Sequence, residues 1–281
     1  MEPRVPATRL TRVQIVKSSG PSSSFKTFYR LHERGILGAT GMIATLLVWQ
    51  LAWSSGLISP LFFSGPSEVV RRFVTEIASG RLISEALYTW GNFFAGFALA
   101  LVVAVPAGIV LGWYQRLNMI FEPLMNLFYA MPRIAFYPLI IIWFGIGAGS
   151  KIFVIFLSAM LPILINTIAG VRNMDADLVR AARAYCATDS QIFLTLALPS
   201  SVPFILTGVR QGVAHGLIGA IIAELFAGSH GLGFIISYAG QVFDTALLLV
   251  GVICVAVSGL VLNIAAQMIQ NRFERWRPQH H

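Results

Sequence analysis

Charged residues are scarce in this sequence. They make up 11% of its 281 positions, whereas hydrophobic residues make up 56%. A soluble domain carries about 25% charged residues, so this chain has too few to cover a surface that faces water. The mean hydropathy of +0.74 points the same way. The composition excludes an ordinary soluble protein and predicts an all-α protein that crosses a membrane several times.

Cysteine is also scarce, and the residue groups typical of enzymes and metal sites are missing from the sequence. Cys186 and Cys254 are too few for a disulfide framework, and we expect both to be free thiols. No nucleophile–base pair and no cluster of metal ligands is evident, so no catalytic residue and no metal is expected. The net charge of +8 would suit a nucleic-acid partner. However, the basic residues gather near the ends of apolar runs, where they set topology, so no nucleic acid is expected.

Six apolar runs are each long enough to form a transmembrane helix, which takes about 20 residues. They are predicted at 36–58, 86–112, 123–144, 152–170, 204–226 and 246–269. The first run lacks a small-x-small cleavage site, which favours a membrane helix over a signal peptide. A short amphipathic helix is predicted at 66–80. The expected domains are a mobile basic tail at 1–34, a transmembrane domain at 35–270 and a second tail at 271–281.

The distribution of basic residues predicts the orientation of these helices. Fourteen of the twenty basic residues fall in segments that would be cytoplasmic if the amino terminus is inside. The four in the external segments are Arg71, Arg72, Arg81 and Lys151. Because basic residues accumulate on the cytoplasmic side, both termini and the loop 171–200 are predicted to lie in the cytoplasm. The expected location is the inner, or plasma, membrane.

The polar loop 171–200 is the longest internal loop. Asp175 or Asp177 can cap a first helix, and a second helix at 191–198 is expected to end at Pro199. A cytoplasmic helix–turn–helix attached to membrane helices at both ends could act as a lever for a partner protein. On these residues alone, a plain solvated connector remains an equal alternative.

The segment 180–199 resembles the EAA loop of permeases of binding-protein-dependent ABC importers, whose pattern is EAA-x3-G-x9-I-x-LP. The residues that match at the right spacing are Ala181, Ala182, Leu198 and Pro199. Two positions depart from the pattern, since Arg180 replaces the usual Glu and Cys186 replaces the usual Gly. These changes affect local contacts and a turn that normally uses glycine, rather than the assignment itself.

The resemblance covers about residues 60–265 and is closest to the branch that handles nitrate, sulfonates and taurine. Further similar stretches are 129–135, 143–147, 166–172, 203–210, 223–224 and 231–233. The resemblance implies a type I ABC importer permease that moves a small, anionic organic or nitrate- or sulfonate-like solute inward by alternating access. It also implies a second permease copy, two ABC ATPase subunits that bind ATP and Mg, and an extracytoplasmic solute-binding protein. No cofactor is expected in this chain itself.

The resemblance also implies which residues couple transport to the ATPase subunits. These are Asp177, Leu178, Arg180, Ala181, Ala182, Arg183, Tyr185, Cys186, Leu198 and Pro199.

The glycine-rich stretch 145–151 is not a phosphate-binding loop, because Ser precedes Lys there. Two alternatives belong to other classes. A secondary transporter or channel would need no ATPase and typically shows inverted repeats, and a membrane enzyme would need a catalytic constellation.

Four ionisable residues are expected at membrane depth, where a charge is costly unless it faces water or a partner. They are Arg133, Arg210, His215 and Glu224. They are candidates for lining the path of an anionic solute, and structural hydrogen bonding is the alternative.

A repeat of small residues at every fourth position of the predicted span 204–226 favours close helix packing. Its glycines are Gly208, Gly212 and Gly216.

Overall fold

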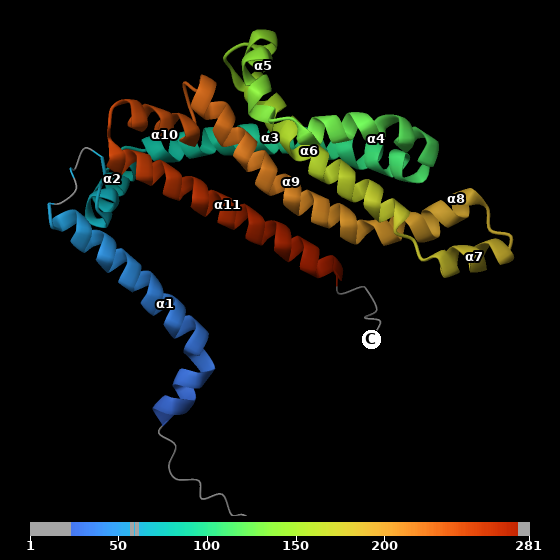
Figure 1. The fold of residues 1–281 in the computed structure, drawn as a ribbon, viewed down its shortest axis with the longest axis horizontal. Helices are drawn as coiled ribbons and strands as arrows, with labels where there is room; N and C mark the ends of the chain where they lie inside the picture. Colours follow the sequence, from blue (N-terminus) through green and yellow to red (C-terminus); the bar gives the residue numbers. More distant parts are fainter. Residues whose placement is uncertain (1–23, 57–58, 60–61, 275–281) are drawn as a thin grey trace, which may run out of the picture. The chain divides into compact units, whose positions relative to one another are not determined.

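The computed structural model describes residues 24–56, 59 and 62–274, which contain helices and no strand. This confirms the all-α class. The elements are α1 Ser24–Ser54, α2 Pro66–Ala78, α3 Arg81–Trp113, α4 Gln115–Ala130, η1 Arg133–Phe136, α5 Tyr137–Phe144, α6 Ala148–Arg172, α7 Ala176–Ala184, α8 Asp189–Ile192, η2 Phe193–Ala197, α9 Leu198–Ala227, α10 Leu232–Gln241 and α11 Thr245–Glu274 (Figure 1). Most of the predicted basic tail lies outside the described residues.

The chain forms two structural units, residues 1–52 and 53–281. The first consists of most of α1, which contains a candidate membrane span at Leu37–Ser54, as predicted. Helix α1 begins at Ser24, so residues 24–34 of the predicted tail are helical. The predicted carboxy-terminal tail likewise begins later, because α11 continues to Glu274.

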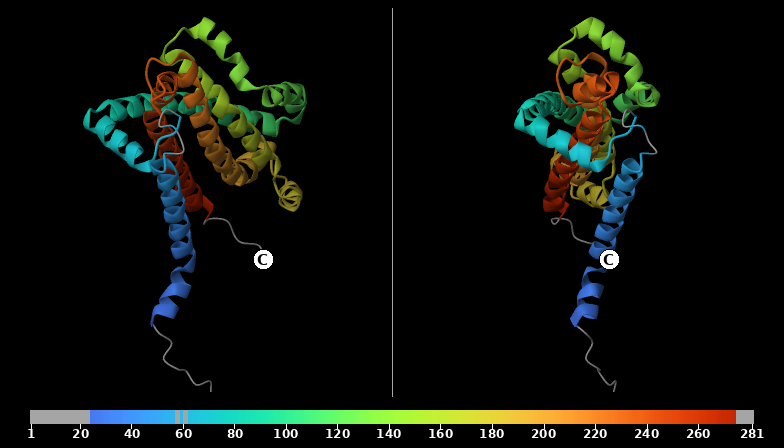
Figure 2. Two further views of the ribbon diagram at one scale, coloured as in Figure 1. Left: turned by 60° about the vertical axis from the view of Figure 1, so that its left-hand side comes forward. Right: turned by 90° about the vertical axis from the view of Figure 1, so that its left-hand side faces the viewer.

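Helices α3, α6 and α9 lie side by side and form the centre of the second unit (Figures 1 and 2). Small residues bring α3 and α6 into close contact. A Cβ on Gly108 would lie 2.6 Å from the Cβ of Thr167, and one on Gly112 would lie 2.6 Å from the Cβ of Val171. Any larger residue would separate the two helices, so these glycines allow the close packing.

Five helices in the described part of the chain are long and apolar enough to cross a membrane, or six if a bent pair counts as one span. The bent pair is α4 with the η1–α5 segment, at an angle of 86°. The sequence predicted this third span at 123–144, interrupted by prolines. The helix instead starts at Gln115 and breaks at Met131 and Pro132, where the backbone is extended. A proline lacks the N–H that would continue the helix.

The prediction that a helix ends at Pro199 was wrong. Helix α8, the π-helical turn η2 and α9 follow one another without a break and form one candidate span, Asp189–Phe226. Pro199 lies in the first turn of α9, where a missing N–H is tolerated. The π-helical turn directly before it changes the hydrogen-bond register and so accommodates the proline.

Helix α10 was not predicted, because its ten residues are too few for a membrane span. It packs with α2, α3 and α11 around one apolar cluster. The buried members of this cluster are Val69, Leu82, Leu232, Ile235, Ala239, Leu247 and Val250. Helix α2 forms close to the predicted range 66–80. Together α2, α10 and the adjoining ends of α3 and α11 make the end of the second unit that the sequence places outside the cell.

Candidate coupling loop and translocation site

The first coupling-loop helix, α7, begins at a side-chain cap. Asp175 precedes the helix in an extended conformation and accepts a hydrogen bond from the backbone N–H of Asp177 at 2.8 Å. This satisfies one of the N–H groups that a helix start leaves without a partner. Of the two caps that the sequence allowed, the structure therefore uses Asp175. Asp177 lies in the first turn and forms an ion pair with Arg180.

The end of α7 is a Schellman turn built around Cys186. The N–H of Ala187 donates to the carbonyl of Ala182 at 3.0 Å, and the N–H of Cys186 donates to that of Arg183 at 2.9 Å. This pattern requires a left-handed residue at the position of Cys186, where glycine is usual. Cys186 has a φ of 58°. The turn is thus kept although a side chain replaces glycine, at a cost of about 1–2 kcal/mol in backbone strain.

Helix α7 buries none of its nine residues against the rest of the chain. The side chain of Leu178 is 55% exposed and that of Tyr185 is 89% exposed. An isolated helix of this length is only marginally stable in water. An exposed apolar surface on such a helix is typical of an element that packs against another protein.

Helix α8 is anchored to the membrane helices, unlike α7. Its Thr188 cap forms a reciprocal capping box with Gln191, Ile192 is buried, and the ring of Phe193 contacts that of Trp113 at the end of α3. Arg183 of α7 lies 2.9 Å from Asp189 of α8. Because α8 continues into α9, a displacement of this loop would move a membrane-spanning helix as a rigid body.

The glycines predicted for helix packing lie where α9 meets its neighbours. A Cβ on Gly208 would lie 2.8 Å from the Cβ of Asn166, and one on Gly212 would lie 2.8 Å from Cγ1 of Ile163, both on α6. A Cβ on Gly216 would lie 3.3 Å from the ring of Phe93 on α3 and 3.4 Å from Ala159 on α6. These glycines therefore set the distance between α9 and the two helices beside it.

The structure does not bring the four predicted path residues together. Arg133 is the first residue of η1, and its side chain lies outside the described residues. Arg210 faces α11, where its Nε donates to Oδ1 of Asn263 at 3.1 Å. His215 is exposed on α9, with Nδ1 2.9 Å from the carbonyl oxygen of Gln211. Glu224 is buried at the other end of the same helix.

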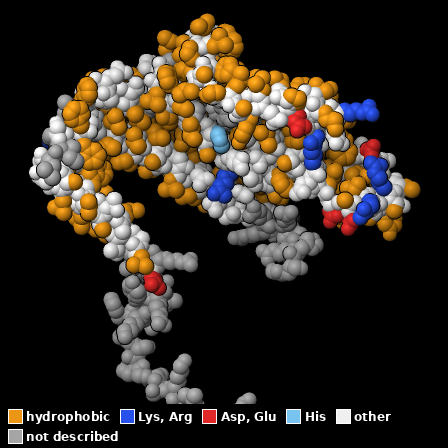
Figure 3. Space-filling view, viewed as in Figure 1, with side chains coloured by type: hydrophobic (Ala, Val, Ile, Leu, Met, Phe, Trp, Pro, Cys, Tyr) orange, Lys and Arg blue, Asp and Glu red, His pale blue; other side chains and the backbone are white. Residues whose placement is uncertain are grey.

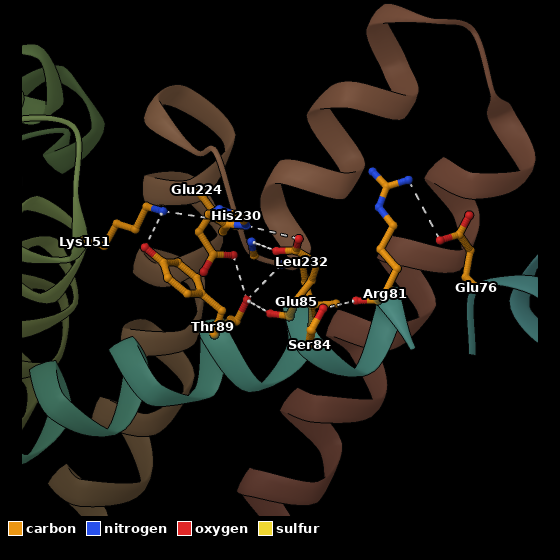
Figure 4. Close-up of polar contacts among 11 residues, drawn as sticks. Glu76, Arg81, Ser84, Glu85, Thr89, Lys151, Glu224, His230 and Leu232 are labelled. Atoms are coloured by element: carbon orange, nitrogen blue, oxygen red, sulfur yellow. Dashed lines mark hydrogen bonds and ion pairs between the residues drawn. The ribbon is translucent and has the colours of Figure 1, made fainter. Parts of the chain in front are cut away.

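Glu224 belongs to a buried polar cluster that holds the α9–α10 loop on α3 (Figure 4). Its side chain, 1% exposed, accepts a hydrogen bond from the N–H of Gly233 at 3.0 Å, and the hydroxyl of Thr89 lies 2.9 Å away. One turn earlier on α3, Glu85 accepts from the N–H of Gly231. Glu85, Thr89 and Glu224 thus accept from the N–H groups of residues 231, 232 and 233 in turn, so Glu224 has a structural role here.

Lys151 completes this cluster from α6. Its ammonium donates to the hydroxyl of Tyr88 and to the carbonyl of His230, both at 3.3 Å, and lies 4.5 Å from the Tyr88 ring centroid. The sequence analysis placed Lys151 in an external connector, but α6 begins at Ala148 and Lys151 is 1% exposed. Because α6 begins before the apolar run from which it was predicted, the ammonium group of Lys151 is buried within the protein.

Sequence reasoning missed the α3 side of the cluster for a similar reason. The second span was predicted from residue 86, whereas α3 starts at Arg81 and includes Glu85 and Thr89. These two residues are four positions apart and so share one helix face. This spacing on α3, together with the Gly-Leu-Gly segment at 231–233, was the only sequence signal that could have indicated the cluster.

Residues 104–277 match the protein family described as the inner membrane component of binding-protein-dependent transport systems. The chain belongs to this family. It is 34% identical to the taurine transport system permease protein TauC of Escherichia coli K12 over 87% of this chain and 91% of that protein. It is 32% identical to the putative aliphatic sulfonates permease SsuC of the same organism, over 85% and 91% of the two chains. A probable ABC transporter permease of Brucella abortus 2308 is 33% identical, over 82% and 90%.

Among solved structures, the inward-facing MetNI methionine ABC transporter shares this fold. The TM-score is 0.62 at 18% identity, covering 70% of this chain and 98% of the other. The chain is thus the membrane-spanning permease of an ABC importer, in the branch predicted from the sequence, and not a secondary transporter or membrane enzyme. Members of this family translocate solutes in the inner membrane, together with separate ATPase subunits and solute-binding proteins.

Proposed function

We propose that two copies of this chain form the translocation path for a small sulfonate-like organic anion. The pair would bind two ATPase subunits, which would hold the ATP and Mg, and would receive the solute from an extracytoplasmic binding protein. Both termini and α7–α8 would face the cytoplasm, as the basic residues favour. Helices α2 and α10 would lie outside. Closure of the ATPase pair would drive alternating access by displacing α8 and α9 together.

One observation carries the coupling part of this proposal. Helix α7 buries no side chain in its own chain, yet it is capped at both ends and held by Arg183 to α8. A preformed helix with an uncovered apolar surface, next to a rigid extension of a membrane helix, has the properties of a docking lever. The ten coupling-loop residues predicted from the sequence lie on α7, in the turn after it and at the start of α9.

The solute class is supported by the names of the similar permeases, which transport taurine or aliphatic sulfonates. A riboflavin permease of Chloroflexus aurantiacus is 34% identical over 85% of this chain, so identity alone does not select the solute. We favour the sulfonate class because three of these relatives share it.

Uptake by the reconstituted complex tests this proposal. The chain would be coexpressed with the ATPase and binding protein of its own organism and placed in proteoliposomes. We expect ATP-dependent accumulation of labelled taurine or a short alkanesulfonate, and none when ATP is replaced by a non-hydrolysable analogue. Uptake of riboflavin but of no sulfonate would overturn the solute class. Sulfonate uptake that needs no ATPase subunit would contradict the coupling mechanism.

A further inference from the structure

Helix α9 leaves one side uncovered at mid-length. Buried and exposed positions alternate in pairs along this part of the helix. The buried ones are Gly212, Val213, Gly216 and Leu217. The exposed ones are Gln211, Ala214, His215 and Ile218. Helix α9 packs against α3, α6, α10 and α11, and the four exposed positions lie on a side that none of these helices covers. Figure 3 shows a histidine and a basic side chain among the hydrophobic side chains of the unit.

Three polar side chains meet on this side of the helix, and we call them the polar face: Asn166, Gln211 and His215. Nδ2 of Asn166 on α6 donates to Oε1 of Gln211 at 3.0 Å. Nδ1 of His215 lies 2.9 Å from the carbonyl of Gln211. Because a carbonyl only accepts hydrogen bonds, Nδ1 carries the proton and donates it.

Two nitrogen atoms of the polar face are left for a ligand. Nε2 of Gln211 and Nε2 of His215 make no hydrogen bond to any described residue. No hydrogen bond or ion pair of the described residues joins a carboxylate to this face. Gln211 Nε2 is a donor, and His215 Nε2 becomes a donor when the ring is protonated. With its proton on Nδ1, the neutral ring of His215 leaves Nε2 an acceptor. The face thus offers a free donor at Gln211, and a second one at His215 when the ring is protonated, without a competing carboxylate.

The depth of the polar face excludes a lipid-facing position. His215 lies twelve residues before Ala227 and seventeen after Leu198, the two ends of α9. At 1.5 Å per residue it is about 18 Å from one end and about 26 Å from the other. Polar groups at this depth need water or a partner, because hydrocarbon offers no hydrogen bonds. The uncovered nitrogen atoms consequently have to face water or a partner protein rather than lipid.

We infer that the polar face lines the solute path at its midpoint and binds the anionic head group of the solute in transit. This rests on the proposed function, in which the same face of a second copy forms the opposite wall. A sulfonate has three acceptor oxygens, which suit donors from two facing copies. Exposed Ala214 and Ile218 on either side of His215 can contact the apolar part of such a solute.

Two other predicted path residues are less suited to this role. Arg210 is adjacent to Gln211 in sequence but is engaged by Asn263 of α11. Glu224 is buried, and its carboxyl group accepts a hydrogen bond from the backbone N–H of Gly233 in its own chain. Of the three predicted path residues with described side chains, His215 alone belongs to the polar face.

Cysteine accessibility tests whether the polar face meets water. Cys186 and Cys254 would be replaced by Ser, and single cysteines introduced as Gln211→Cys and His215→Cys. Two controls are Val213→Cys, which is buried on the same helix, and Leu260→Cys, which is exposed at similar depth on apolar α11. An ionic thiosulfonate reagent should modify the first pair at least about tenfold faster than the controls, since thiolates form in water and not in lipid. Equal reactivity at all four positions would overturn the inference.

Uptake tests whether the face binds the solute. Gln211→Leu and His215→Leu should lower ATP-dependent taurine uptake at saturating binding protein by at least about tenfold, the size expected for one lost hydrogen bond to a charged group. Leu260→Met should leave uptake within about twofold, and all three should unfold at the wild-type temperature. Unchanged uptake in both Leu variants would overturn the subsite. If the wild-type complex imports no sulfonate, the proposed solute fails instead, and the accessibility result still decides whether the face lines the path.

Discussion

Gly231 lies so close to the carboxylate of Glu224 that a Cβ on Gly231 would overlap it. Gly231 also has a φ of 112°, a conformation that residues with side chains rarely adopt. Its N–H donates to Glu85. The overlap and the positive φ thus each require glycine at this position of the α9–α10 loop, and the loop in turn is held to α3 by Glu85 and Thr89.

Gly231→Ala should therefore destabilise the folded chain by more than about 2 kcal/mol, because overlap and backbone strain add. Thermal unfolding of the detergent-purified protein would show this as a lowered midpoint. Gly91→Ala is the matched control, since a Cβ there meets nothing within 4 Å inside helix α3. That variant should be neutral or slightly more stable. Equal midpoints for the two variants would contradict the proposed constraint.

Replacement of Glu224 should separate a structural role from a role in the path. Glu224→Ala leaves the N–H of Gly233 without its partner in a buried site, which costs about 1–3 kcal/mol. Glu224→Gln keeps a carbonyl oxygen for this bond, so it should cost less. We expect the unfolding midpoint to be highest for the wild type, lower for Glu224→Gln and lowest for Glu224→Ala. A Gln variant with wild-type stability and no sulfonate uptake would show that the carboxylate charge serves transport directly.

Cys186→Gly should stabilise the end of α7. Glycine adopts the left-handed conformation of this Schellman turn without the strain of a side chain, a gain of about 1 kcal/mol. Hydrogen exchange at the N–H of Ala187, which donates to Ala182 across the turn, should become slower. Cys186→Ala is the control, because it removes the thiol but keeps the Cβ. Slower exchange in the Ala variant as well would point to the thiol rather than to the backbone.

The sequence predicted the membrane helices and the presence of helices in the loop 171–200 better than the polar sites. Apolar runs and basic flanks identify membrane helices because hydrocarbon imposes both patterns. They do not show where a helix extends beyond its apolar run, and so Glu85 and Lys151 were assigned outside. The continuation of α8 through Pro199 depends on a π-helical turn, which no residue pattern marks. Similarly, which side of α9 stays uncovered at His215 depends on packing against other helices.

Impermeant thiol labelling of intact cells tests the orientation. Ser79→Cys, exposed after α2, should be labelled from outside, because residues 59–85 are predicted to be external. The wild-type chain should stay unlabelled, although its Cys186 is exposed, until the membrane is permeabilised. Labelling of wild-type Cys186 in intact cells, with Ser79→Cys protected, would invert the topology.

The measurement that tests the account most directly is coupling in a Leu178→Asp variant. Leu178 is exposed on α7, a helix with no buried residue, so the substitution should leave insertion and unfolding unchanged. If α7 docks into the ATPase, the new carboxylate loses water there at a cost of several kcal/mol. The assay uses proteoliposomes with ATPase and binding protein and measures the ratio of sulfonate molecules taken up to ATP molecules hydrolysed. This ratio should fall to zero in Leu178→Asp and stay at the wild-type value in Leu178→Met. A Leu178→Asp complex that transports at the wild-type rate and ratio would contradict the claim that this loop couples ATP hydrolysis to transport.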